Sequence, residues 1–190
     1  AEYTTAKMAI QDEEWVKAEE FLFKALEVEP ENAEIMVQIG YHVYAKQEQW
    51  VEMNEIFDKA LKANPEAKMN SRPITESIRN YRNMFWAENY NGAIQTYNQY
   101  REVKDKTLLQ DAINRFEQTV NIDPSEGQTY SILATSYYEL GNNDEAILNG
   151  EKAVELMPND FQPNMALGQI LSFSGNKESA INYIEKAREI

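Results

Sequence analysis

His42 is the only histidine of this 190-residue chain, and the chain has no cysteine. A protein zinc site needs three or four His, Cys or carboxylate ligands, so a lone His is a poor metal site. A serine nucleophile would have to use the same His42 as its base, and no nucleophile-elbow sequence is present. We therefore predict no metal site and no catalytic triad, and we expect His42 to be a packing or surface histidine.

The carboxylates and glycines also lack the spacing that catalysis requires. Glu13-Glu14 and Glu19-Glu20 are adjacent in sequence, so on a helix the two side chains of each pair point about 100° apart and form a solvated face. Gly92, Gly127 and Gly141 are isolated, so no glycine-rich loop is present to hold a phosphate. These patterns predict a protein that is not an enzyme and that binds no cofactor.

Composition limits the partners that the chain could bind. The sequence has 18 Lys and Arg against 32 Asp and Glu, a net charge of −14, and 43% hydrophobic residues. The apolar content predicts a folded core, whereas the acidity argues against nucleic acids and anionic membrane surfaces, which attract basic proteins. No apolar stretch is long enough to insert into a bilayer. The expected partner is a protein or a peptide.

Four prolines mark an internal repeat. Pro30, Pro65, Pro124 and Pro158 each follow a segment typical of the end of a helix, such as Lys-Ala-Leu-Glu-Val-Glu before Pro30. Their separations are 35, 59 and 34 residues, and two of the three match a unit of about 34 residues. The chain is therefore expected to be built from repeated units, with an irregular one before Pro124.

Residues 127–158 form the clearest unit. Apolar and small residues recur there every three or four positions, which places them on one face of each of two helices. They are Tyr130, Leu133, Ala134 and Tyr137, followed by Ala146, Gly150, Ala153 and Val154. Between the two sets, Gly141 and Asn142 read as a helix stop followed by a helix start. Each unit is thus predicted to be a pair of antiparallel helices, with the alanines where the helices come closest.

This pattern resembles the tetratricopeptide repeat. The matching residues are Ala134, Tyr137, Gly141, Ala146, Gly150, Ala153 and Pro158, then Leu167, Gly168, Leu171, Gly175, Ala180, Ile184 and Ala187. The second unit matches at Ile39, Gly40, Tyr44, Phe57, Ala60, Leu61 and Pro65, with Met53 in place of the first Ala and one extra residue in its turn. The first unit matches at Ala6, Ala18, Leu22, Ala25, Leu26 and Pro30. The resemblance implies an all-α fold, a right-handed α-solenoid of about five helix-turn-helix repeats in one domain. The approximate repeats are 1–30, 31–65, 66–124, 125–158 and 159–190.

The third unit is longer than the others, and its apolar residues keep one helical phase from Ile74 to Tyr100. We favour one extended first helix from about Pro73 to about Arg101, since Gly92 is the only interior helix breaker and proline is tolerated at a helix start. The alternative breaks the helix near residues 89–92 and gives three helices.

An extended helix of this kind also resembles one in a group of bacterial envelope-associated, often lipid-anchored repeat proteins. The matching residues are Trp86, Tyr90-Asn91 and Tyr97-Asn98. This second resemblance implies a place at the bacterial cell envelope, on its periplasmic side, with the cytoplasm as the alternative. The chain has no cysteine that a lipid could modify.

The family resemblance implies a concave face, lined by the first helix of each repeat, that binds a peptide or partner protein. The positions carried over are Glu34, Val37, Tyr41 and Tyr44; Gln128, Ser131, Thr135 and Tyr138; and Gln162, Met165, Gln169 and Phe173, with Arg82 and Phe85 at equivalent places in the third repeat. Tyrosine rings contribute apolar area and amides bond to a peptide backbone. The alternative is that some of these aromatic residues pack between repeats. Family members that clamp a C-terminal carboxylate use Lys and Asn on successive first helices. Those positions hold Val37, Ser131 and Met165, and Tyr41, Thr135 and Gln169 here, so we expect no such clamp.

Only one segment of the chain has a net positive charge. Residues 66–106 contain seven Lys and Arg against five Asp and Glu, and every other segment is acidic. Arg72, Arg79, Arg82 and Trp86 are spaced as one helical stripe. The stripe could anchor an acidic partner through forked hydrogen bonds, or it could pair with the protein's own acidic repeats, which we favour.

Three functions fit these features. The first is a non-catalytic scaffold that holds a peptide or partner protein in the concave face. The second is a homo-oligomerisation module that uses the end repeats or the long helix, and the third is an adaptor domain of a larger enzyme or envelope assembly. No capping helix follows the last repeat before Ile190, so we expect either more chain or another molecule to cover that edge.

Overall fold

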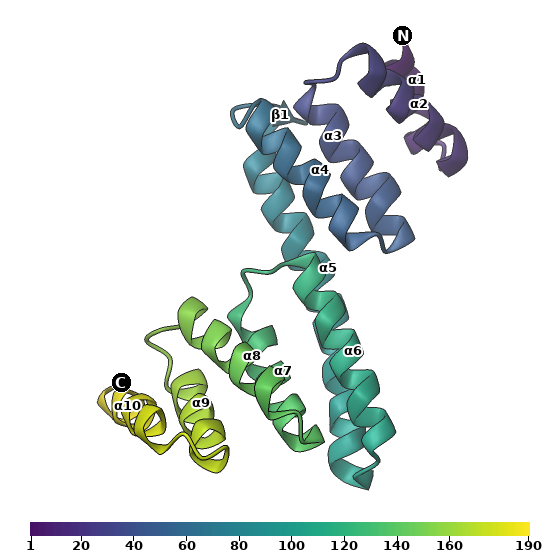
Figure 1. The fold of residues 1–190 in the computed structure, drawn as a ribbon. Coiled ribbons are helices and arrows are strands. Elements are labelled where there is room, and N and C mark those ends of the chain that lie inside the picture. Colours follow the sequence, from purple (N-terminus) through teal and green to yellow (C-terminus); the bar gives the residue numbers. More distant parts are fainter. The chain divides into compact units, whose positions relative to one another are not determined.

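Helices joined by short turns make up almost the whole of the computed structural model, which describes residues 1–190 (Figure 1). The α-helices are α1 (Glu2–Gln11), α2 (Trp15–Val28), α3 (Ala33–Ile39), α4 (Trp50–Ala63), α5 (Ile74–Val103), α6 (Lys106–Ile122), α7 (Gly127–Leu140), α8 (Asn143–Leu156), α9 (Phe161–Phe173) and α10 (Lys177–Glu189). The expected all-α helical solenoid is confirmed. No helix is both long and apolar enough to cross a membrane.

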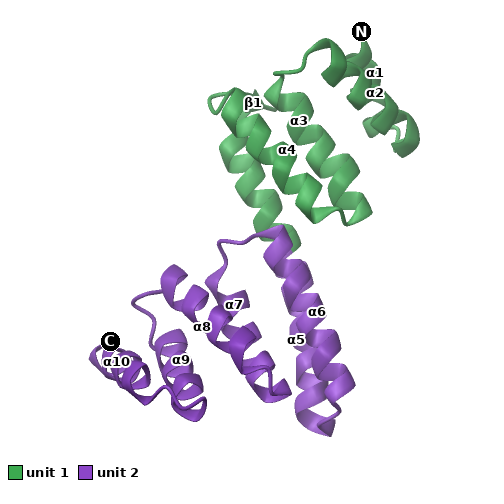
Figure 2. Cartoon of the chain, in the orientation of Figure 1, with its two compact units in different colours: residues 1–85 green, residues 86–190 purple.

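The chain divides into two compact units (Figure 2). Unit 1 is Ala1–Phe85 and contains α1 to α4 with the first part of α5, and unit 2 is Trp86–Ile190. In unit 2, α7 packs against α8 and α9 packs against α10, as the predicted helix pairs require. That all 190 residues form one continuous solenoid stays a prediction.

The helix ends follow the local signals in the sequence. Gly141 adopts a left-handed φ of 99° after α7, and the backbone N–H groups of Gly141 and Asn142 both bond to the carbonyl of Tyr137. This arrangement satisfies carbonyls that would otherwise lack a partner, and glycine has no Cβ to clash in it. At helix starts, the side chains of Asn32 and Asp160 accept backbone N–H bonds from the first turns of α3 and α9.

The third repeat begins with a single helix, as the favoured interpretation predicted. Helix α5 has 30 residues, about 45 Å at 1.5 Å per residue, and passes through Gly92 without a break. Its first part contributes Ile74 and Ile78 to the core of unit 1. Its later part contributes Ala93 and Tyr97 to a core cluster of unit 2 with Leu109, Ala112, Ile113 and Phe116 from α6. One periodic apolar face therefore serves two cores.

The second repeat absorbs its extra residue inside its first helix. After α3, residues Gly40–Tyr44 form a π-helical turn (η1) and Ala45–Gln47 a short 3-10 turn (η2), followed by Glu48 with a φ of 56°. A π-turn inserts one residue into an α-helix without ending it. We expected the additional residue in the loop, and the structure places the irregularity one turn earlier.

Glycines at helix contacts allow close packing. A Cβ added to Gly40 would lie 2.3 Å from Cε1 of Phe57, and one added to Gly150 would lie 2.9 Å from Cδ1 of Leu167. Gly150 therefore replaces the larger residue of the family pattern because Leu167 of α9 occupies that space. The alanines expected at the closest helix approaches, Ala134, Ala146 and Ala153, are buried.

A small hairpin that the sequence did not predict precedes α5. Strands β1 (Lys68–Met69) and β2 (Arg72–Pro73) pair antiparallel around Asn70 and Ser71, whose φ angles are 51° and 67°. Two left-handed residues in succession suit a two-residue hairpin turn. Met69 is buried, and its sulfur accepts a bond from the Gln38 amide, so the hairpin is anchored to α3.

His42 is a packing residue. Its ring stacks on Trp15 with centroids 5.9 Å apart and meets the edge of Tyr41 at 4.8 Å, all within unit 1. Burial, and secondarily the positive charge of Lys46, lowers the pKa of His42 to about 4. The imidazole is therefore neutral at neutral pH and part of an aromatic cluster.

The close contact at Gly40 predicts that Gly40→Ala destabilises the protein by about 1–3 kcal/mol, because the methyl group would force Phe57 out of its packed position. Gly92→Ala is the matched control, since no atom lies within 4 Å of its added Cβ. The free energy of unfolding from urea titrations should fall for the first variant and should not fall for the second. Equal stability of the two variants would contradict the close packing at η1.

The lowered pKa of His42 predicts a pH-dependent contribution to stability. The unfolded chain binds a proton at His42 below about pH 6.5, whereas the folded protein does so only below about pH 4. The contribution of His42 is therefore complete above pH 6.5 and is lost as the pH falls toward 4. In urea titrations at several pH values, the stability difference between wild type and His42→Gln should shrink across this window, and a constant difference would contradict it. Carboxylate titration affects both proteins and cancels in the difference.

Candidate functional site

The predicted contact residues of unit 1 do not gather in one place. Tyr41 and Phe85 come together: the Tyr41 ring stacks on Tyr81 at 4.2 Å and lies 5.8 Å from Phe85, which in turn is 5.4 Å from Trp50. Tyr44 packs edge-on against Phe23 of α2 instead. The rings Tyr41, Tyr81 and Phe85 are half-buried and form an aromatic surface where η1 meets α5, and Tyr81 was not among the predicted residues.

Glu34 lies at a separate hollow of about 530 Å³ in unit 1. The lining residues come from the turns after α2 and α4, the start of α3 and strand β1: Glu29, Pro30, Glu31, Asn32, Ala33, Glu34, Asn64, Ala67 and Lys68. The hydroxyl of Tyr3 donates to Oε1 of Glu34 at 2.7 Å, and burial together with this carboxylate raises the pKa of Tyr3. Glu34 therefore ties α1 to α3.

The two arginines of the predicted site differ in their surroundings. Nε of Arg82 donates to Asn54 at 2.6 Å and its Nη2 donates to Asp58 at 2.9 Å, so its guanidinium holds α5 to α4. Arg79 is exposed. For Arg82, these bonds agree with the favoured interpretation, in which the arginine stripe pairs with the protein's own acidic repeats.

In unit 2, four predicted residues line one cavity of about 400 Å³. Gln128, Ser131 and Thr135 come from α7 and Gln162 comes from α9. The remaining lining residues are Tyr90, Ile132, Met157, Asp160 and Pro163. Gln128, Ser131 and Thr135 are spaced three and four residues apart, so they share one face of α7. The cavity therefore lies along the first helices of the last two repeats.

Tyr90 forms a fixed wall of this cavity. Its ring stacks on Trp86 at 4.7 Å and lies 5.6 Å from Phe116. The Trp86 indole is itself held, since its Nε1 donates to Oγ1 of Thr129 at 2.9 Å. Trp86 and Tyr90, two of the residues that suggested an envelope-associated protein, thus have a structural role in unit 2. Periodicity identified Tyr90 as apolar, but nothing in the sequence placed it opposite α7 and α9.

The remaining predicted residues lie farther along the same two helices. The rings of Tyr138 and Phe173 stack with centroids 5.9 Å apart, and Phe173 is 74% exposed. Gln169 is exposed between Gln162 and Phe173 on α9. The starts of α7 and α9 thus meet at the cavity and their ends meet at the ring pair, so the two helices run in the same direction.

The cavity can form hydrogen bonds but offers little acid–base chemistry. Asp160 is the only carboxylate among its lining residues, which include no Lys, Arg or His. Oδ1 of Asp160 already accepts the backbone N–H of Gln162 at 3.0 Å. The Thr135 hydroxyl donates to the Ser131 carbonyl at 3.2 Å. The side-chain amides of Gln128 and Gln162 remain available to a ligand.

The bonds of Arg82 lead to a prediction on stability. Arg82→Glu should lower the free energy of unfolding by about 1–3 kcal/mol, because it removes two hydrogen bonds and places a carboxylate beside Asp58. Arg79→Glu should change it by less than about 0.5 kcal/mol, as expected for an exposed position. Thermal unfolding followed by circular dichroism compares the two, and equal losses would contradict a structural role specific to Arg82.

Comparison with known proteins bears on the repeat architecture. The tetratricopeptide repeat family model matches residues 127–160 and 162–190. The curated Protein CTR9 homolog of Arabidopsis thaliana is 29% identical over 82 residues, which are 43% of this chain and 7% of that protein. The chain thus spans far less than two thirds of that relative.

Solved structures show a similar fold at low sequence identity. TTC0263, a thermophilic tetratricopeptide repeat protein of Thermus thermophilus, is 16% identical with a TM-score of 0.50, over 100% of this chain and 91% of that one. MamA 41-end from Desulfovibrio magneticus RS-1 is 18% identical, with a TM-score of 0.44 over 99% and 92%. The matched repeats, the helix pairs and the small residues between them lead to one conclusion: residues 127–160 and 162–190 of this chain are tetratricopeptide repeats.

Proposed function

We propose that the protein is a non-catalytic scaffold that binds a peptide segment of a partner protein on the first-helix face of unit 2. Tetratricopeptide repeats in general present such a face for protein interactions, because their stability comes from contacts between neighbouring repeats and leaves the face free. The observation that carries the proposal is the cavity of about 400 Å³, which four of the contact residues predicted from the sequence line together.

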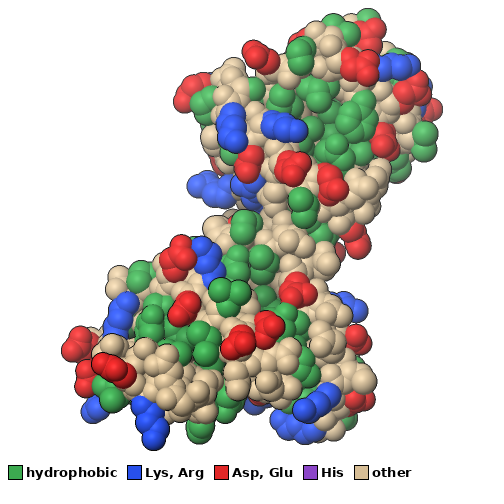
Figure 3. Space-filling view, in the orientation of Figure 1, with side chains coloured by type: hydrophobic (Ala, Val, Ile, Leu, Met, Phe, Trp, Pro, Cys, Tyr) green, Lys and Arg blue, Asp and Glu red, His purple; other side chains and the backbone are tan.

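The lining chemistry suits an extended peptide. Tyr90, Ile132 and Met157 provide apolar walls for a side chain. The Gln128 and Gln162 amides can both donate to and accept from a peptide backbone. In the space-filling view, green apolar side chains gather in patches among charged ones on each unit (Figure 3), as expected for recognition surfaces with polar rims.

The aromatic surface of unit 1, formed by Tyr41, Tyr81 and Phe85, is proposed as a second contact region. Its rings are rigid and half-buried, so they can bury more area on binding at little cost in conformational entropy. Each unit would then contact the partner through its own face.

Site-specific photocrosslinking tests the proposal. A benzophenone amino acid at exposed Gln128 should give crosslinked partners in the producing cells, whereas the same group at exposed Glu151 of α8 should not give those species. Adding Ser131→Arg should abolish the Gln128 adducts, because the guanidinium occupies the cavity and introduces charge. Identical adducts from both positions, or adducts that survive Ser131→Arg, would contradict binding at this face.

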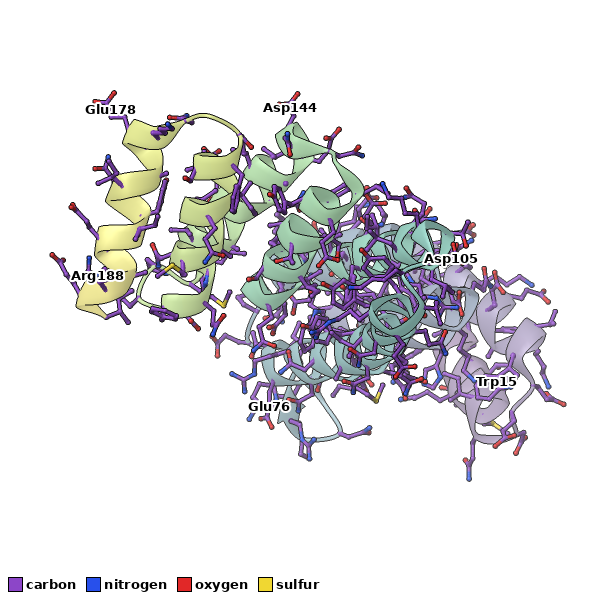
Figure 4. The ribbon with its side chains drawn as sticks, turned by 90° about the horizontal axis from the view of Figure 1, so that it is seen from below. Trp15, Glu76, Asp105, Asp144, Glu178 and Arg188 are labelled. Carbon is purple, nitrogen blue, oxygen red and sulfur yellow. The ribbon has the colours of Figure 1, made fainter.

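Homo-oligomerisation is the second candidate function, and exposed apolar residues in the end repeats favour it. Val16 of α2 is 85% exposed and Ile181 of α10 is 54% exposed. Seen from below, Glu178 and Arg188 project outward from α10 (Figure 4), so charge flanks this surface. Multi-angle light scattering over a concentration series tests this candidate: a mass that stays at 22.0 kDa excludes it.

A further inference from the structure

We infer that the segment held by unit 2 is extended, carries no charge at its contact positions, and is read at two points about 10–15 Å apart. This inference rests on the proposed function and names the chemistry of its ligand. The first point is the cavity at the starts of α7 and α9, and the second is the stacked ring pair Tyr138–Phe173 at their ends.

The absence of charge follows from the cavity lining. A carboxylate entering it would find no Lys, Arg or His, and would lie near Asp160. The lining offers no cation to an anion and places the like charge of Asp160 beside it, so acidic side chains and a free C-terminal carboxylate are disfavoured there. A basic side chain would find a single carboxylate that already caps the start of α9. The ligand group that fits this lining is an uncharged apolar side chain, with the peptide's neighbouring backbone amides hydrogen-bonded to Gln128 and Gln162.

The ring pair supplies the second point. Phe173 is 74% exposed, more than any other aromatic ring among the large exposed hydrophobic residues. It nevertheless has a fixed orientation, because its ring stacks on Tyr138 with an interplanar angle of 28°. An exposed and oriented ring pair is a platform on which a third ring can stack, and burial of the Phe173 face would stabilise the complex. The ligand residue that fits there is an aromatic residue or a proline.

The spacing follows from the helices. On α7 the cavity lining runs from Gln128 to Thr135, which lie ten and three residues before Tyr138. On α9, Gln162 lies eleven residues before Phe173, so the centre of the cavity is about 10–15 Å from the ring pair. An extended peptide advances about 3.3 Å per residue. The apolar residue in the cavity and the ring on the platform should therefore be about three to five residues apart.

A peptide library tests the inference on the intact chain. Phage displaying random twelve-residue peptides are selected on the wild-type protein and counter-selected on Ser131→Arg. The enriched peptides should share an uncharged core in which an aromatic residue or proline lies about three to five positions from an apolar residue. Enriched peptides with acidic residues in that core would overturn the inference.

Binding of one enriched peptide, made synthetically, then distinguishes the contributions of the two contact points to affinity. Phe173→Ala should weaken binding about tenfold by isothermal titration calorimetry. Leu148→Ala is the matched control, since Leu148 is 66% exposed on α8 and lies outside both points, and its affinity should be unchanged. Amidation of the peptide's C-terminus should also leave the affinity unchanged. A large loss on amidation would overturn the inference.

Failure of the inference is distinguishable from failure of the proposed function. Peptides that bind wild type, lose binding to Ser131→Arg and bind Phe173→Ala with full affinity would support the cavity and refute the two-point recognition. If no peptide is enriched on wild type over Ser131→Arg, the proposed function fails, and the inference fails with it.

Discussion

The burial of one helix pair against the next is the constraint on which this structure depends. A single pair of tetratricopeptide helices cannot cover its own apolar face, so each pair must find the next one along the chain. In unit 2 this contact requires glycines, which have no side chain, as well as large apolar residues. Gly150 of α8 leaves the space that Leu167 of α9 occupies, and within the last pair Gly168 does the same for Ile184. The interior is packed closely enough that one methyl group at such a place must displace a neighbour.

The same constraint explains why the first-helix face can take polar residues. Because the cores lie between successive helices, Gln128, Ser131 and Thr135 can line an open cavity without weakening the fold. The Tyr90 wall of the cavity is also fixed in position, because Tyr90 stacks on Trp86 and Trp86 donates a hydrogen bond to Thr129. The polar lining is thus held in place by packed aromatic residues, and this preorganisation lowers the entropic cost of binding a flexible segment.

Much of the fold could be predicted from the sequence because helix periodicity and helix ends are local properties. The alanines at close approaches, the stop at Gly141 and the single long helix α5 all follow from spacing within one or two turns. The π-turn at Gly40–Tyr44 and the hairpin at Asn70 and Ser71 could not be predicted in this way. Gly40 of the π-turn packs against Phe57, and Met69 of the hairpin bonds to Gln38. Both contacts join residues that are distant in sequence.

The candidate site shows the same division. The sequence by itself determined which residues share a helical face, since Gln128, Ser131 and Thr135 recur at the helical period, and it determined the acidic, cysteine-free character of the chain. Tertiary structure decided which of those faces meet. It brought Gln162 to α7, set Tyr90 opposite both, and engaged Arg82 with Asn54 and Asp58. The reason is physical: a period fixes a side chain's direction about its own helix axis, whereas its neighbours depend on how helices pack, which is a property of the whole core.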